Sequence, residues 1–185
     1  MKRSMYQKWC FRKAEIKRKV LAKFYQKDTG ILDIGSGNCA LSKLLIESGY
    51  SLTALDISNK SAFPDFQPMI YDGHRLPFED NSFDWVQLIT VLHHVPDPEA
   101  LIIEAKRVGK IILIQEETYK NTLQKYLTWL ADSVNNWEFR GHPHTNKTEE
   151  EWETLFLRHH LKLQQKERRR FLFFFTQVTY LLSKD

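Results

Sequence analysis

The stretch from Ile31 to Leu45 constrains the fold of this chain more than any other. It opens with a short apolar run and passes through two glycines, Gly35 and Gly37. It ends in apolar residues at helical spacing, Ala40, Leu41, Leu44 and Leu45. This pattern predicts a buried strand, a tight turn and the start of a helix. Because glycine lets a ligand approach backbone N–H groups and a helix N-terminus adds unpaired donors, the turn is a candidate ligand-binding element.

The overall composition favours one folded domain. The chain has 185 residues, of which 42% are hydrophobic, and a net charge of +4 that suits an anionic partner without requiring one. Two distant cysteines, Cys10 and Cys39, predict neither a disulfide framework nor a metal site. The basic N-terminus lacks a signal-peptide core, and no apolar run approaches the roughly 20 residues that span a bilayer. We expect a cytoplasmic protein with no membrane span.

The first part of the chain alternates between helix and strand patterns. Residues 1–27 form a basic arm that predicts one or two amphipathic helices, either packed on a sheet or reaching over an anionic substrate. Strands are then expected at 31–34, 51–56, 68–71, 85–89 and 110–115, with helices at 39–48 and 97–108. Such alternation predicts a parallel sheet covered by helices on both faces.

The ends of these strands carry the candidate site. Ligands of parallel sheets bind beyond the carboxyl ends of the strands, at a switch in strand order. We therefore expect five residues at or just past the carboxyl ends of the predicted strands to share one crevice: Asp33, Gly35, Asp56, Asp72 and Thr90.

The last third of the chain predicts two helices and a hairpin. We expect a helix at 119–135, a loop at 136–147 and a second helix that starts at Thr148 with Glu151 completing a capping box. Two strands, at 161–167 and 173–182, would pair as an antiparallel hairpin. The three arginines 168–170 are expected to form the loop between them.

The acidic residues narrow the choice of ligand. The spacing Gly35-x-Gly37-x-x-Ala40, with Asp56 about 20 residues beyond, fits a dinucleotide fingerprint. However, Asp33 at the end of the first strand would repel a diphosphate, which argues against a nicotinamide oxidoreductase. Asp72 offers an acceptor for an adenine amino group. The pattern therefore favours a nucleoside ligand that carries a cation.

Six motifs in order give the chain a family resemblance. They are Leu-Asp-Ile-Gly-Ser-Gly at 32–37, Ala-Leu-Asp-Ile-Ser at 54–58, Tyr-Asp-Gly at 71–73, Leu-Pro-Phe at 76–78, Asn-Ser-Phe-Asp at 81–84 and Val-Leu-His-His-Val-Pro-Asp at 91–97. The chain resembles class I S-adenosylmethionine-dependent methyltransferases that act on small molecules. The resemblance implies a three-layer α/β, Rossmann-like fold. Its seven-stranded, mostly parallel sheet has the order 3-2-1-4-5-7-6, with the last strand antiparallel.

The resemblance also implies a division of the chain and a set of cofactor contacts. Residues 1–185 would be one domain, with a cofactor-binding half at 28–117 and substrate-side helices and the hairpin at 118–185. The residues implied to bind S-adenosylmethionine are Asp33, Gly35, Ser36, Gly37, Asp56, Ile57, Asp72, Gly73, Ile89 and Thr90. Among them, Asp33 would approach the amino group of the methionine moiety, Asp56 the ribose hydroxyls and Asp72 the adenine amino group. Cys39 stands where the family usually has a third glycine.

The methyl acceptor is less constrained. His93, after the fourth strand, is the candidate general base, and His142 and His144 are candidate lid residues. The Asn-Pro-Pro-Tyr motif of enzymes that methylate the amino groups of adenine or glutamine is absent, which favours a small-molecule acceptor. The basic segments leave RNA or another anionic macromolecule open as acceptor, and a non-catalytic S-adenosylmethionine-binding regulatory module is a further alternative.

Overall fold

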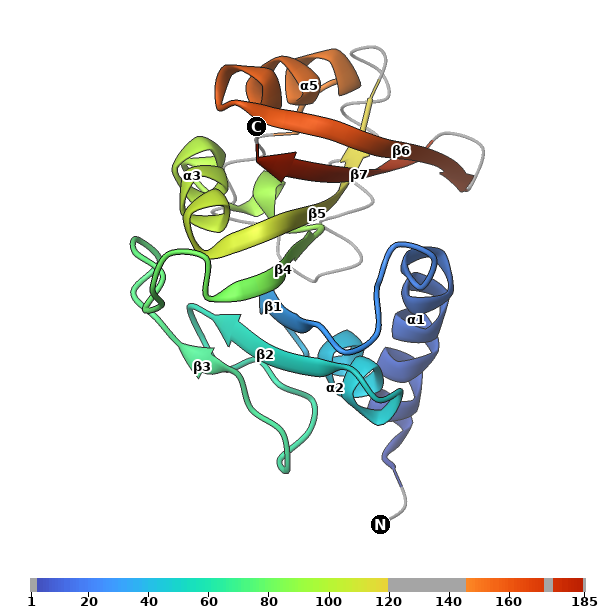
Figure 1. The fold of residues 1–185 in the computed structure, drawn as a ribbon. Coiled ribbons are helices and arrows are strands. Elements are labelled where there is room, and N and C mark those ends of the chain that lie inside the picture. The colour runs from blue at the N-terminus through green and yellow to red at the C-terminus, as the bar shows by residue number, and fades with distance from the viewer. Residues whose placement is uncertain (1–2, 120–145, 172–174, 185) are drawn as a thin grey trace. The chain divides into compact units, whose positions relative to one another are not determined.

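The computed structural model describes residues 3–119, 146–171 and 175–184. These residues contain one seven-stranded sheet in the order β3-β2-β1-β4-β5-β7-β6 (Figure 1). The strands are β1 (Gly30–Ile34), β2 (Ser51–Asp56), β3 (Met69–Ile70), β4 (Phe83–Ile89), β5 (Gly109–Thr118), β6 (Leu161–Phe171) and β7 (Phe175–Lys184). The predicted α/β fold class and strand order are confirmed, and β7 runs antiparallel to both of its neighbours.

The described helices are α1 (Met5–Leu21), α2 (Ala40–Glu47), α3 (Pro98–Val108) and α5 (Glu149–Arg158), with a short 3-10 helix, η1, at Leu92–His94. The residues fall into two compact units: Met1–Gln87 with Arg107–Lys110, and Leu88–Lys106 with Ile111–Asp185. The expected single domain stays a prediction. No helix within the described ranges combines the length and the apolar composition that crossing a bilayer requires.

The first unit is built on parallel strand pairs. β1 pairs with β2 from Gly30 opposite Ser51 to Ile34 opposite Leu55, and β2 pairs with β3 through Asp56 opposite Ile70. Four of the five residues of β1 are buried, as the apolar run predicted. The parallel register places the carboxyl ends of these three strands at one edge, which is where ligands of such sheets bind.

The predicted basic arm is a single helix, α1, that packs against α2 (Figure 1). Ser4 caps its N-terminus in a capping box with Gln7. The inner face of α1 buries Cys10, Phe11 and Ala14 in a cluster with Phe63, whose ring meets the Phe11 ring edge to face at 4.9 Å. This inner face ties α1 to the folded unit.

The second unit contains the antiparallel hairpin and α5. Thr148 and Glu151 form the predicted capping box at the start of α5. One face of α5 buries Trp152 and Phe156, and the Phe156 ring packs edge to face on Tyr180 of β7 at 5.1 Å. Aromatic rings therefore fill the contact between α5 and β7.

One expectation about the hairpin was wrong. The arginines 168–170 do not form a loop, because β6 continues through them to Phe171 and pairs with β7 along that length. An edge strand tolerates charged side chains since they remain in solvent, and Arg168 also donates to the Glu149 carboxylate at 2.6 and 2.8 Å. The run of three charged residues was therefore wrongly interpreted as a loop.

The other boundaries moved by a few residues. β3 is shorter than expected, at two residues, and β5 extends three residues beyond the expected end at Gln115. The expected helix at 119–135 and loop at 136–147, including His142 and His144, lie outside the described residues except for residues 119, 146 and 147.

Candidate functional site

The glycine turn after β1 is tied to the end of β2. Gly35 and Gly37 both have positive φ, at 72° and 53°, which only glycine adopts without strain. The N–H groups of Gly35 and Ser36 donate to the Leu55 carbonyl at 2.8 and 3.2 Å. Cys39, in the position of the missing third glycine, also has a left-handed φ of 59° and is buried. The turn therefore keeps its tight shape despite the substitution.

Asp56 joins β2 to the glycine turn. One oxygen of its carboxylate accepts a hydrogen bond from the Gly37 N–H at 2.8 Å, and the other accepts from the Ser58 N–H at 3.2 Å. Only 9% of the residue is exposed. The structure thus brings Gly37 and Asp56 together, as their spacing suggested. The structure also shows a role of Asp56 that the sequence did not reveal: its carboxylate holds the glycine turn in place.

Asp33 is a buried carboxyl at the end of β1. It accepts a hydrogen bond from the Ser42 hydroxyl, and the Gln87 side chain, which accepts from the Tyr25 hydroxyl, also favours its charged form. Burial nevertheless dominates and raises the pKa of Asp33 to about 6. Nothing in the sequence pattern pointed to Ser42, Gln87 or Tyr25 as partners, because they lie on other elements.

Replacing Asp33 with asparagine is expected to stabilise the protein near neutral pH by about 2 to 3 kcal/mol. The folded-state pKa lies above the unfolded value of 3.8, so the proton on Asp33 stabilises the fold at low pH. That contribution is lost as the pH rises through about 6. Urea unfolding across this range should show the wild-type losing stability relative to Asp33→Asn.

The matched control is Asp84→Asn. Asp84 accepts from the Gly30 N–H and pairs with Lys110 at 2.8 Å, and these contacts lower the pKa of its carboxyl. A lowered pKa gives the opposite sign, since stability is then lost as the pH falls. Equal pH dependence in the two variants would contradict the account of Asp33.

Asp72, Gly73 and Ile57 lie at the same edge of the first unit. The Asp72 carboxylate accepts from the backbone N–H groups of His74 and Arg75 at 2.9 and 3.3 Å, so it caps its own turn. Gly73 has a φ of 83°, and a Cβ there would lie 3.3 Å from the Ile57 side chain. Ile57 is 63% exposed. Gly73 and Ile57 therefore form an open apolar surface of the kind that a flat ring covers.

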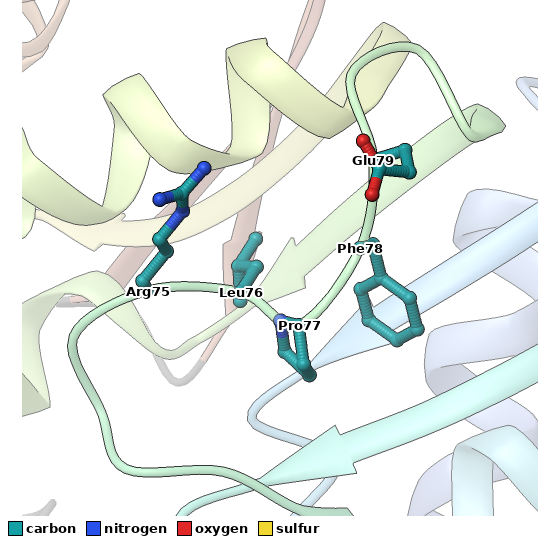
Figure 2. A pocket seen from close by; sticks show the side chains of 5 residues that line it. All are labelled: Arg75, Leu76, Pro77, Phe78 and Glu79. Carbon is teal, nitrogen blue, oxygen red and sulfur yellow. The ribbon is translucent and has the colours of Figure 1, made fainter.

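A shallow hollow of about 320 Å³ follows this turn along residues 75–79. Figure 2 shows Leu76 on the opposite side of the loop from Pro77 and Phe78. The Arg107 guanidinium fixes the loop by donating to the Leu76 and Phe78 carbonyls at 2.9 and 2.7 Å. None of the predicted cofactor residues lines this hollow, so it is not the site that the sequence predicted.

Ile89 and Thr90, the last predicted cofactor residues, are in the second unit. Thr90 has a φ of 58°, which is strained for a β-branched residue. Its N–H donates to the Gln115 carbonyl at 2.7 Å, which holds the strained backbone. Their place beside a cofactor stays a prediction.

Glu116 organises the segment after β4. It is fully buried, and one of its oxygens accepts from the N–H groups of Val91 and Leu92 at 2.9 and 2.7 Å. Its other oxygen lies 2.5 Å from Nδ1 of His93. His93 is buried as well. Its role as a general base stays a prediction. Glu116 was not among the predicted site residues, although an acid directly after a strongly apolar run is a signal for such a position.

Comparisons with known proteins identify a methyltransferase domain in part of the chain. The model of the methyltransferase domain family matches residues 32–111. A demethylmenaquinone methyltransferase of Renibacterium salmoninarum is 34% identical over 86 residues, which cover 43% of this chain and 36% of that protein. A ubiquinone biosynthesis O-methyltransferase of Idiomarina loihiensis is 26% identical over 132 residues, covering 62% of this chain and 53% of the relative. The chain thus spans about a third to about half of the length of these relatives.

A solved structure supports the same fold. A SAM-dependent methyltransferase from Methanosarcina mazei has a TM-score of 0.67 and 22% identity, covering 89% of this chain and 96% of that one. The family match supports the resemblance to methyltransferases over residues 32–111, and the strand order confirms the expected fold of the described residues.

Proposed function

We propose that this chain, whose residues 32–111 carry a methyltransferase domain of class I, transfers a methyl group from S-adenosylmethionine to a small-molecule acceptor. The observation that carries the proposal is the placement of Asp33, Asp56 and Asp72 at or just past the carboxyl ends of three neighbouring parallel strands. Acids at these positions suit a ligand with a cation and a ribose and disfavour a diphosphate.

The residues fit such a cofactor. Asp33 is a buried carboxyl whose ionisation is costly, and an ammonium group beside it would offset that cost. Asp56 would hold the ribose, and Ile57 and Gly73 present the open apolar surface for the adenine. Ser36 would lie with the two glycines along the methionine moiety.

The cofactor would supply an electrophilic methyl group on a sulfonium. The protein then has to align the acceptor and exclude water, and a base is needed only when the acceptor is protonated. His93 is the proposed base, and Glu116 would hold its Nδ1 side. Since one relative is named a demethylmenaquinone methyltransferase and another a ubiquinone biosynthesis O-methyltransferase, quinone precursors are the first acceptors to test.

The test begins with calorimetry of S-adenosylhomocysteine and of NAD. We expect binding of the first and none of the second, and the reverse result would favour an oxidoreductase. Labelled methyl transfer is then measured with hydroquinone acceptors and with RNA. Incorporation into RNA alone would replace the small-molecule acceptor. Cofactor binding without transfer to acceptors in cell extract would favour the non-catalytic module.

A further inference from the structure

The outer face of α1 carries large apolar and aromatic side chains that are about half exposed or more. Met5, Tyr6, Trp9 and Ile16 are 87%, 57%, 47% and 49% exposed. At 100° per residue, Met5, Trp9 and Ile16 lie within about 40° of one another around the helix. They form an apolar stripe on the side away from the buried Cys10 and Ala14. Single exposed apolar residues are common, but an aligned stripe indicates an interaction surface.

Cations flank this stripe. Lys8, Arg12 and Lys19 are exposed along one side, and Lys13 is exposed on the other. The sequence of α1 contains one acidic residue, Glu15, and its carboxylate is paired with Arg18 at 2.7 Å. The outer face is therefore strongly cationic, and its complement is an anionic surface.

The aromatic residues of the face are arranged for a boundary between water and an apolar phase. The Tyr6 and Trp9 rings are stacked with centroids 6.1 Å apart. Nζ of Lys13 lies 3.8 Å from the centroid of the Trp9 ring. Tyrosine and tryptophan favour such boundaries because one part of each ring is apolar and the other forms hydrogen bonds, while lysine reaches outward along its stem.

We infer that the outer face of α1 docks the protein on an anionic lipid surface, with the helix lying in the plane of the interface. A lipid surface matches both parts of the face, because acyl chains would bury Met5 and Ile16 while headgroup phosphates would pair with the cations. Single-stranded nucleic acid matches less of it, since stacking on bases uses aromatic rings and leaves Met5 and Ile16 without a role.

The experiment is co-sedimentation of the full chain with vesicles. Vesicles of phosphatidylcholine with about one-third phosphatidylglycerol should bind the protein, and pure phosphatidylcholine vesicles should bind it much less. The variant Lys8→Gln/Arg12→Gln/Lys19→Gln should lose about fivefold in partitioning per cation removed. The variant Met5→Ser/Ile16→Ser should lose at least about tenfold.

Matched controls come from the second unit. Leu157→Ser removes an apolar side chain that is 74% exposed on α5, and Lys162→Gln removes an exposed cation from β6; both should bind vesicles as the wild type does. All variants should keep the wild-type affinity for S-adenosylhomocysteine, which separates this test from that of the proposed function.

Three results would overturn the inference. The first is equal partitioning of wild type and Met5→Ser/Ile16→Ser, which includes the case in which neither binds. The second is binding to single-stranded RNA, lost in the cation variant, without vesicle binding. The third is a dimer in solution that dissociates in Met5→Ser/Ile16→Ser, because a second copy would then cover the face.

Discussion

Removing the Glu116 carboxylate by substitution with alanine is expected to lower the free energy of unfolding by about 3 to 5 kcal/mol. The change leaves the N–H groups of Val91 and Leu92 and the His93 ring without their shared acceptor inside the fold. A buried donor that loses its partner is costlier than the bond itself is worth. Urea denaturation followed by circular dichroism measures the change.

Two further substitutions serve as controls for this prediction. Glu116→Gln keeps an acceptor oxygen but loses the charge, so its cost should be smaller, at about 1 to 2 kcal/mol. Glu117→Ala removes the neighbouring, only partly buried acid and should cost less than about 1 kcal/mol. If Glu116→Ala and Glu117→Ala proved equally stable, Glu116 would not organise this segment.

Replacing Asp56 with alanine is expected to weaken binding of S-adenosylhomocysteine by about 1 to 3 kcal/mol. The proposed ribose contact is lost, and the Gly37 N–H also loses the acceptor that holds the glycine turn. Isothermal titration calorimetry measures the affinity for S-adenosylhomocysteine. Thermal unfolding of the same variant shows whether the glycine turn has also been destabilised.

Asp65→Ala serves as the comparison. Asp65 is an exposed acid of the same unit that pairs with Lys43 at 2.8 Å, and its removal should leave cofactor affinity unchanged. Wild-type affinity in Asp56→Ala would count against the whole cofactor assignment, since Asp56 is central to it.

The parts of the fold that were predictable from the sequence depend on local patterns. The boundaries of β2 at 51–56 follow from its own residues, and the start of α5 follows from the capping box of Thr148 and Glu151. The glycine turn was predictable because positive φ restricts the residue type. The strand order followed from the family resemblance.

The contacts of the site were less predictable. Asp33 and Asp72 stand at the strand ends where the motifs put them, yet Asp33 is paired with Ser42 and Asp72 caps its own turn. Such partners depend on tertiary packing, which leaves no periodic signal in the sequence. Glu116 was missed for the same reason, since its partners are 23 to 25 residues away.

The position of β6 at the end of the strand order has a consequence for how the protein behaves at high concentration. A terminal strand offers unpaired backbone groups to which another chain can add, and this is a common route to aggregation. Lys162, Arg169 and Arg170 are exposed along β6, so a second strand of the same sequence would bring like charges together. The arginines that were wrongly assigned to a loop thus help to oppose the pairing of this strand with a second copy.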